Sequence, residues 1–257
     1  MKKLEEKITA CEAMKSYPSE IYYEGNKELL ARKKVSIVGS RKTSKYSREM
    51  THKLSYSLAK VGVCIVSGGA MGIDAVAHLG AGASNTIAVL PCGINVKYPS
   101  VNKNLLKNIE DEGLLLSQFK ADDKARPWTF VVRNELVVAL GEVLVVAEAE
   151  LDSGSMRSIE YALSMGKEIF VFPHRLGESS ATNTLLKEGK AKAIYDINAF
   201  VSRFGNVANF QVNKDEFLEY CENNSDYDAV VSKFSSKVFE YELLGKIEVV
   251  NGKINVL

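Results

Sequence analysis

Long apolar runs and paired cysteines are both missing from this 257-residue sequence. No apolar run approaches the ~18 residues that a membrane-spanning helix needs. The four cysteines, Cys11, Cys64, Cys92 and Cys221, are scattered without a Cys-x-x-Cys pair, which argues against a zinc site. The segment Met1–Lys7 is charged and leads into no apolar stretch, so it does not resemble a secretion signal. These absences predict a cytoplasmic protein with reduced cysteines and no bound metal or membrane.

The motifs of common nucleotide and hydrolase sites are missing as well. A dinucleotide site needs Gly-x-Gly-x-x-Gly after a strand and an acid about 20 residues further on. The first glycine loop, Gly39–Ser44, has one glycine, and the next strand-like run ends in Ser67. No Gly-Lys pair is followed by Ser or Thr, so there is no Walker A loop, and Ser67 does not lie in a Gly-x-Ser-x-Gly elbow. We therefore expect no cofactor, and the sequence offers no local set of catalytic residues.

The sequence does contain four apolar strand-like runs, each followed by a loop of small residues. The loops are Gly39-Ser40-Arg41, Ser67–Gly72, Pro91-Cys92-Gly93 and Ser153-Gly154-Ser155. Runs that are apolar at nearly every position are buried on both faces, which predicts an α/β fold with a doubly wound, mostly parallel sheet. The carboxyl ends of parallel strands meet at one edge, so these loops should gather there beside helix N-termini. Such an edge is suited to phosphate.

Composition and periodicity divide the chain into a short N-terminal extension, a large α/β domain, a polar linker and a C-terminal module (1–33, 34–205, 206–214 and 215–257). The extension should contain a helix and then an extended piece, Pro18–Tyr23, that could add to the sheet edge. In the module, three helical patterns precede a hairpin with an Asn251-Gly252 turn, which together outline a winged helix. The last 47 residues carry nine acids and five lysines, so packing or protein contact is a better expectation for the module than tight DNA binding.

Positive charge gathers near the first glycine loop. Between Arg32 and Lys53 the sequence has eight lysines and arginines against one acid, Glu49. A basic cluster is usually a solvated face, but this one adjoins a loop at the end of a strand, which favours an anionic ligand. Arg41 could hold a phosphate with its planar fork of donors. The alternative for Arg41 is an ion pair with Asp74.

Aromatic rings interleaved with arginines form a second candidate surface. Arg126, Trp128, Phe130 and Arg133 fall within eight residues, in a predicted loop that leads into a helix over Arg133–Leu140. Bases stack on aromatic rings while arginines pair with phosphates, so this pattern suits a nucleic-acid strand. The alternative is that Trp128 and Phe130 pack as core residues over the sheet edge.

Two further loops offer backbone N–H groups to a ligand. The small residues of Ser67–Gly72 let a backbone approach closely, but Asp74 follows at the start of a helix, where an acid itself stabilises the helix dipole. A phosphate on this loop would have to avoid Asp74. Ser153-Gly154-Ser155 opens a helix near Met156, and either serine could be its N-cap.

Several of these motifs follow one another in a distinctive order. They are Ile37–Arg41, Ser67–His78, Ile87–Gly93 with Tyr98-Pro99, Phe130-x-x-Arg133-Asn134 and Ser153-Gly154-Ser155. In this order they resemble the DprA/Smf family, the DNA-processing proteins of bacterial natural transformation. The resemblance spans about residues 17–205, and the C-terminal module is similar to the winged-helix-like domain appended in that family.

The resemblance implies an extended Rossmann-like domain that is not an enzyme. It implies a protein that binds and protects incoming single-stranded DNA, forms a homodimer and helps to load RecA recombinase. The DNA-binding residues that we predict are Gly39, Ser40, Arg41, Ser67, Gly68, Gly69, Arg126, Phe130, Arg133, Asn134, Ser153, Gly154 and Ser155. Two positions depart from the family: Glu135 stands where a second arginine is common, and Pro127 where a basic residue is expected.

Two other functions remain open at this point. The first is a nucleotide enzyme of the lysine decarboxylase-like phosphoribohydrolase type, whose proteins resemble Pro-Gly-Gly-x-Gly-Thr-x-x-Glu after a late strand. Here Ser153–Glu160 keeps an acid near that spacing but lacks the second and third glycines. The second is a protein-binding role in which the glycine-rich edge holds no ligand.

Overall fold

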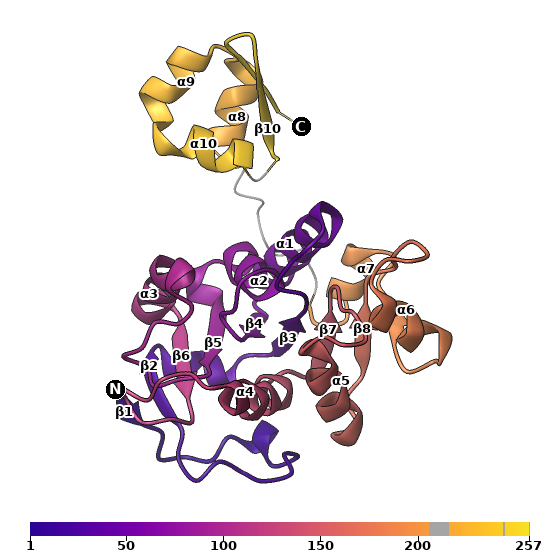
Figure 1. Ribbon diagram of the computed structural model, residues 1–257. Coiled ribbons are helices and arrows are strands. Elements are labelled where there is room, and N and C mark those ends of the chain that lie inside the picture. Colours follow the sequence, from indigo (N-terminus) through magenta and orange to yellow (C-terminus); the bar gives the residue numbers. More distant parts are fainter. Residues whose placement is uncertain (206–215, 244, 257) are drawn as a thin grey trace. The chain divides into compact units, whose positions relative to one another are not determined.

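The computed structural model describes residues 1–205, 216–243 and 245–256, and the chain divides into two compact units, Met1–Val207 and Ala208–Leu257 (Figure 1). The predicted linker, 206–214, lies outside the described residues. None of the helices described is both long and apolar enough to span a bilayer.

The first unit is built on a nine-stranded sheet with the order β1-β2-β6-β5-β4-β3-β7-β8-β9. Its strands are β1 (Lys2–Lys3), β2 (Tyr22–Gly25), β3 (Lys34–Val38), β4 (Cys64–Ser67), β5 (Thr86–Leu90), β6 (Leu114–Ser117), β7 (Val143–Val146), β8 (Ile169–Val171) and β9 (Lys192–Ala193). Strands β3 to β9 pair in parallel, whereas β1 and β2 join antiparallel at one edge. The predicted doubly wound, mostly parallel sheet is confirmed.

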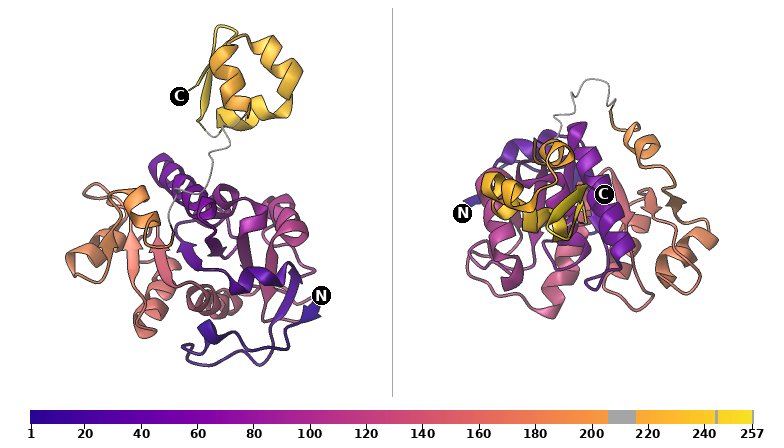
Figure 2. Two further views of the ribbon diagram at one scale, coloured as in Figure 1. Left: turned by 180° about the vertical axis from the view of Figure 1, so that it is seen from behind. Right: turned by 90° about the horizontal axis from the view of Figure 1, so that it is seen from above.

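Helices cover both faces of the sheet, as the views in Figures 1 and 2 show. They are α1 (Lys45–Lys60), α2 (Ile73–Ala81), α3 (Lys103–Glu112), α4 (Pro127–Leu140), α5 (Ser155–Ser164), α6 (Ser180–Lys187) and α7 (Ile197–Val201). Residues of one strand alternate between the two sides. In β3, Val35 and Ile37 belong to the core that includes residues of α1, α2 and α7, and Val38 belongs to the core that includes residues of α4, α5 and α6.

Strand β3 marks the point where the chain reverses its direction of travel across the sheet. It pairs with β4 on one side and with β7 on the other, so the connections from β3 and β7 lead away in opposite directions. In open α/β sheets, a crevice forms outside the carboxyl ends of the strands at such a reversal, and ligands bind there. The first and fourth glycine loops flank this crevice.

Two of the predicted elements differ in the structure. The N-terminal extension has short 3-10 turns, Thr9–Cys11 and Lys27–Ala31, in place of the predicted helix. Ile8, Cys11 and Met14 are buried in the core on the α4 side, so tertiary packing outweighs the helical spacing of this segment. The predicted addition of a strand at the sheet edge is confirmed, because β2 pairs with β6.

The second difference concerns the start of α4. The predicted loop over Arg126–Phe130 is largely the first turn of this helix, which begins at Pro127. Proline is favoured at the first helical position, and the Arg126 N–H donates to the Thr129 hydroxyl at 3.0 Å. This turn therefore projects its side chains from a rigid element.

The second unit contains α8 (Glu216–Asn223), α9 (Tyr227–Phe234), α10 (Ser236–Leu243) and the hairpin of β10 (Ile247–Val250) with β11 (Lys253–Val256). Asn251 and Gly252 both have positive φ, as the predicted type I′ turn requires. A separate core packs the helices against the hairpin and is formed by Phe217, Cys221, Val230, Val238, Ile247 and Ile254. The predicted winged-helix-like arrangement is therefore present.

Candidate nucleic-acid interface

A groove of about 840 Å³ opens at the crevice beside β3. It is lined by the end of β3, the loop between β4 and α2, the first turns of α4 and α5, and Tyr98. Of the predicted DNA-binding residues, it brings together Gly39, Ser40, Arg41, Gly68, Arg126, Phe130, Arg133, Asn134, Ser153, Gly154 and Ser155. Ser67 and Gly69 are buried beneath it, where the Ser67 hydroxyl donates to the Ile37 carbonyl at 2.6 Å. Segments up to about 120 residues apart in sequence thus form one surface.

The first glycine loop is held by the end of β7. The Ser40 N–H donates to the Glu148 carbonyl at 2.8 Å, and the Ile73 N–H donates to the Ser40 carbonyl at 3.1 Å. The Glu148 carboxylate accepts from the Ser44 N–H at 3.0 Å and from its hydroxyl at 2.8 Å. Burial acts to raise the pKa of Glu148, but hydrogen bonds from Ser47 and Ser44 outweigh it and lower that pKa. The loop is therefore fixed and leaves the Arg41 side chain exposed.

Arg41 lies against an aromatic pair at the groove. Its guanidinium carbon is 5.2 Å from the centre of the Phe130 ring, a cation–π distance. The Tyr98 ring meets Phe130 edge to face, with ring centres 5.8 Å apart, and the Tyr98 side chain is 44% exposed. An exposed arginine beside a partly exposed aromatic pair offers both phosphate pairing and base stacking.

Asp74 pairs with Arg133 and not with Arg41, so the alternative considered for Arg41 is wrong. One Asp74 carboxylate oxygen lies 3.7 Å from Arg133 Nη1 and accepts from the N–H groups of Gly68 and Ala70 at 3.1 and 3.4 Å. Burial raises the pKa of Asp74, and the charge of Arg133 opposes that rise. Two N–H groups of the second glycine loop therefore donate to a carboxylate of the same chain.

The N-terminus of α5 is different, because it is uncapped. Gly154 stands at its N-cap position, with no capping hydrogen bond from a side chain, and Ser155 begins the helix. The predicted serine N-cap is therefore wrong. The hydroxyl of Ser153 is buried and has no hydrogen-bond partner among the described residues. This end of α5 presents helix N–H groups, with their partial positive charge, to the groove.

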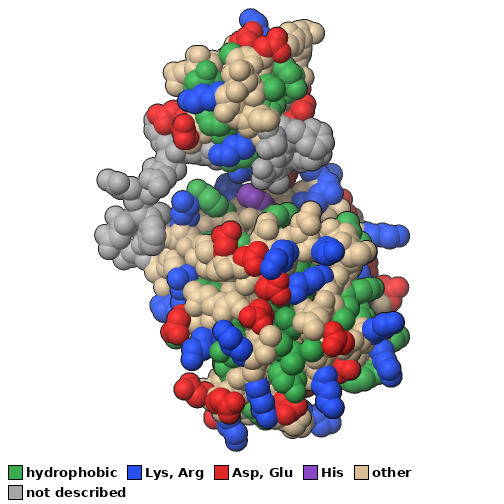
Figure 3. Space-filling view, turned by 90° about the vertical axis from the view of Figure 1, so that its left-hand side faces the viewer, with side chains coloured by type: hydrophobic (Ala, Val, Ile, Leu, Met, Phe, Trp, Pro, Cys, Tyr) green, Lys and Arg blue, Asp and Glu red, His purple; other side chains and the backbone are tan. Residues whose placement is uncertain are grey.

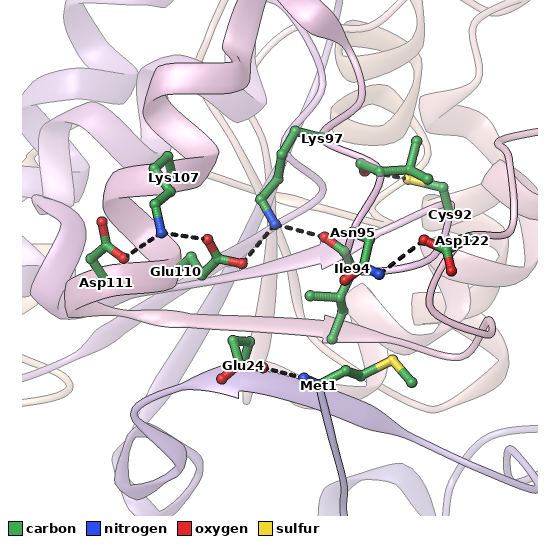
Figure 4. Close-up of polar contacts among 11 residues, drawn as sticks. Met1, Glu24, Cys92, Ile94, Asn95, Lys97, Lys107, Glu110, Asp111 and Asp122 are labelled. Atoms are coloured by element: carbon green, nitrogen blue, oxygen red, sulfur yellow. Dashed lines mark hydrogen bonds and ion pairs between the residues drawn. The ribbon is translucent and has the colours of Figure 1, made fainter.

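Among the lining residues that were absent from the predicted set, Tyr98, Lys42 and Arg157 have side chains that suit a nucleic acid. Tyr98 could have been found, since the Tyr98-Pro99 pair belongs to the motif order that carries the resemblance. Polar contacts fix the connection that holds it: Lys97 Nζ donates to the Ile94 carbonyl at 2.6 Å and to Glu110 at 2.7 Å (Figure 4). Nothing in the sequence alone marked Lys42 or Arg157 apart from other surface cations.

Two residues singled out in the sequence lie away from the groove. Trp128 is 55% exposed and packs edge to face on Phe119, with ring centres 5.7 Å apart. Glu135 accepts a hydrogen bond from the Lys15 N–H at 2.8 Å and does not line the groove. Its negative charge therefore faces the N-terminal extension.

The lining is strongly biased toward positive charge. Among the described residues, its basic members are Arg41, Lys42, Arg126, Arg133 and Arg157, and its acid is Asp74. Elsewhere the signs mix: on the face in Figure 3, acidic and basic side chains are interspersed. The groove therefore concentrates positive charge, which suits an anion.

Two features that an enzyme site could use are the acid of the phosphoribohydrolase motif and a group of metal-binding residues. Glu160, the acid at the spacing of the phosphoribohydrolase motif, pairs with Arg157 at 2.7 Å on an exposed part of α5 and does not line the groove. In the part of the chain that the structure describes, no group of three or more His, Cys, Asp or Glu residues could hold a metal ion.

Residues 6–205 match the family described as DNA recombination-mediator protein A. The chain belongs to this family, the DprA/Smf proteins. It is 36% identical over 176 residues to DNA processing protein DprA of Streptococcus pneumoniae, a match that covers 67% of this chain and 62% of that one. It is 35% identical over 182 residues to protein Smf of Escherichia coli, covering 69% of this chain and 49% of that one. The match thus spans less than two thirds of either relative.

Solved structures from the family share the fold. DNA processing protein A of Helicobacter pylori, whose structure concerns its single-stranded DNA binding mode, aligns with a TM-score of 0.77 and 38% identity, covering 79% of this chain and 94% of that one. The structure of DprA from Streptococcus pneumoniae aligns with a TM-score of 0.71 and 32% identity, covering 77% of this chain and 71% of that one. The extended Rossmann-like fold is that of these DprA structures.

Proposed function

We propose that the groove binds single-stranded DNA without sequence preference. The observation that carries this proposal is the combination, in one open groove, of exposed arginines, a partly exposed aromatic pair and an uncapped helix N-terminus. A strand can use all three, because its phosphates are anionic and its unpaired bases stack. Contacts of this kind read no base edges, so no sequence code is expected.

Each part of the groove has a role in the proposal. Arg41, Lys42 and Arg126 pair with phosphates, and the N-terminus of α5 holds a further phosphate. A base stacks on Tyr98 or Phe130.

We extend the proposal to the work of the family: the chain takes part in DNA processing during natural transformation. In this role it protects incoming strands in the cytoplasm, acts as a homodimer and delivers DNA to RecA recombinase, without catalysing a reaction. Membership of the DprA/Smf family supports these parts. Light scattering after size exclusion tests the dimer, and DNA-dependent co-elution with purified RecA tests the partner.

The binding experiment is a titration of a labelled mixed-sequence oligonucleotide, single-stranded or as a duplex, between 50 and 200 mM salt. Each phosphate contact should contribute about −0.7 to the slope of log affinity against log salt for a single strand. We expect tighter binding of the single strand and a steep salt dependence. A flat dependence would sink the proposal.

Arg41→Ala tests the site itself. It should weaken binding of every sequence alike and reduce the magnitude of the salt slope by about 0.7, the contribution of one phosphate. Arg48→Ala is the matched control, because Arg48 is an exposed arginine of α1 that does not line the groove. Equal effects of the two variants would remove Arg41 from the binding site.

A further inference from the structure

We infer that Asp74 and Arg133 are positioning residues of this groove, an internal ion pair that shapes the DNA site without touching the strand. The inference rests on the proposed function of the groove. It differs from the expectation, drawn from the family resemblance, that Arg133 and the Gly68-Gly69 loop contact DNA directly.

The carboxylate of Asp74 occupies the place that a phosphate would take on the second glycine loop. The N–H groups of Gly68 and Ala70 both point at one Asp74 oxygen, at 3.1 and 3.4 Å, and Arg133 Nη1 is 3.7 Å from the same oxygen. Asp74 is 7% exposed. A phosphate brought to these N–H groups would meet a negative charge already seated there.

The far side of this loop is also held by the protein. The Asn102 side-chain amide donates to the carbonyls of Gly69 and Ala70, both at 3.0 Å. The backbone of the loop is therefore tied on one side to Asp74 and on the other to Asn102. It acts as a wall of the groove, whereas the start of α5 has no side-chain cap.

Arg133 is enclosed. It is 3% exposed, and its Nη1 donates to the Val89 carbonyl at 3.2 Å. A Cβ added to Gly68 would lie 1.2 Å from Nη1, so the guanidinium fits only because residue 68 is glycine. Its Nε is buried and has no hydrogen-bond partner among the described residues.

The same guanidinium supports the aromatic ring at the groove. The guanidinium carbon of Arg133 is 6.0 Å from the centre of the Phe130 ring, which the exposed Arg41 approaches at 5.2 Å. The buried ion pair therefore holds the second glycine loop through Asp74 and lies against Phe130 through Arg133. Because binding costs less when the site is already ordered, this fixation should contribute to affinity.

The salt dependence of binding separates a buried positioning arginine from one that pairs with phosphate. Binding releases counterions only where a cation neutralises a phosphate. The charge of Arg133 is balanced by Asp74 and shielded from solvent, so it should release none. Arg41 should release about one.

The experiment compares Arg133→Met with Arg41→Ala, using the full chain, a single-stranded oligonucleotide of mixed sequence and several salt concentrations. We expect Arg133→Met to weaken binding by about tenfold through lost preorganisation, with the wild-type salt slope. Arg41→Ala should reduce the slope by about 0.7. A slope reduced equally in Arg133→Met would make Arg133 a phosphate ligand and overturn the inference, as would wild-type affinity.

Asp74→Asn guards against loss of the fold, because asparagine keeps the shape and an acceptor oxygen. We expect weaker binding with an unchanged slope, whereas tighter binding would mean that Asp74 repels the strand and would overturn the inference. Thermal melting of the same samples distinguishes a positioning role from a purely structural one. In a purely structural role the melting temperature falls but the folded variant binds as the wild type does, and that result would also overturn the inference. If the wild-type chain binds no single strand, the proposed function itself fails, whatever the variants do.

Discussion

At the scale of single residues, a substitution of Gly154 should change the stability of the fold and the affinity for DNA in different ways. Its backbone is helical, with φ −60° and ψ −19°, and a Cβ added there would have no atom within 4 Å. Gly154→Ala should therefore keep or raise stability, by up to about 1 kcal/mol, because alanine restricts the unfolded chain. The added methyl group would stand at the mouth of the groove, so we expect weaker binding of single-stranded DNA. Thermal melts and oligonucleotide titrations of the same samples check both, and unchanged affinity would place the strand away from α5.

His78 should make the stability of the fold depend on pH. It is fully buried, and burial, with Arg133 nearby, lowers its pKa to about 3 from the ordinary 6.5. Below pH 6.5 His78 is protonated in the unfolded chain but stays neutral in the folded chain, so the free energy of unfolding falls as pH falls toward 3. The loss from pH 6.5 to 5 should be about 2 kcal/mol.

His78→Asn is the variant that isolates this effect. The Thr86 hydroxyl donates to the Ile65 carbonyl at 2.8 Å, so His78 Nδ1 acts as the donor to Thr86 at 2.6 Å. The asparagine amide can make the same donation but does not titrate. Urea unfolding at pH 7, 6 and 5 should show a smaller loss in the variant than in the wild type. Parallel pH dependences would contradict the assignment.

At the scale of elements, α4 turns one face to the groove. Pro127, Phe130, Val131 and Asn134 lie at helical spacing and all line it, whereas Glu135 contacts Lys15. The two positions at which this chain lacks the positive charge of its family are therefore not equivalent. Only the one at Pro127 faces the proposed path of the strand.

Pro127→Lys should tighten binding of single-stranded DNA and steepen the salt slope by about 0.7, since it adds one cation beside the strand. Glu135→Lys makes a larger change in net charge but on another side of the helix. We expect it to have the smaller effect on the slope. Titrations of the two variants across salt check this, and the reverse ranking would show that the strand runs past Glu135.

At the scale of the whole molecule, each unit has its own core, and charge divides unevenly between them. The last 47 residues carry five lysines and nine acids, a net charge of 5 − 9 = −4. Because the whole chain has a net charge of +1, residues 1–210 carry a net charge of +5. The cores of the first unit contain no residue of the second, and the reverse holds for the described residues. The stability of the first unit should therefore not depend on the module.

A chain ending at residue 205 should melt as the first unit of the full chain does and should bind single-stranded DNA at least as tightly at low salt. Removal of the acidic module lessens long-range repulsion of the strand, and that gain should vanish at high salt, where the charges are screened. Calorimetry and titration at two salt concentrations check the result. Weaker binding by the shortened chain would give the module a direct part in holding DNA.

Local patterns predicted the elements with strong local signals. The apolar runs of β3, β4, β5 and β7 and the Asn251-Gly252 hairpin are all present. The prediction of an N-terminal helix was wrong. Ile8, Cys11 and Met14 have helical spacing, but they are buried against the domain without a helix, and the spacing alone cannot distinguish the two arrangements. The start of α4 was predicted as a loop because aromatic rings and arginines are interleaved there, although proline is favoured at the first helical position, where Pro127 stands.

The sequence by itself determined that the strands are parallel and buried, that their small-residue loops share one edge, and that positive charge lies near the first of them. These properties follow from composition and period along the chain, which are local. Only the tertiary structure decided which polar groups remain free at that edge. Asp74 accepts hydrogen bonds from the N–H groups of the second glycine loop and pairs with Arg133, whereas Arg41 is exposed and the start of α5 has no side-chain cap. The physical reason is that a hydrogen-bonding group is available to a ligand only when the fold brings it no partner, and partners such as Asp74 and Arg133 are 59 residues apart.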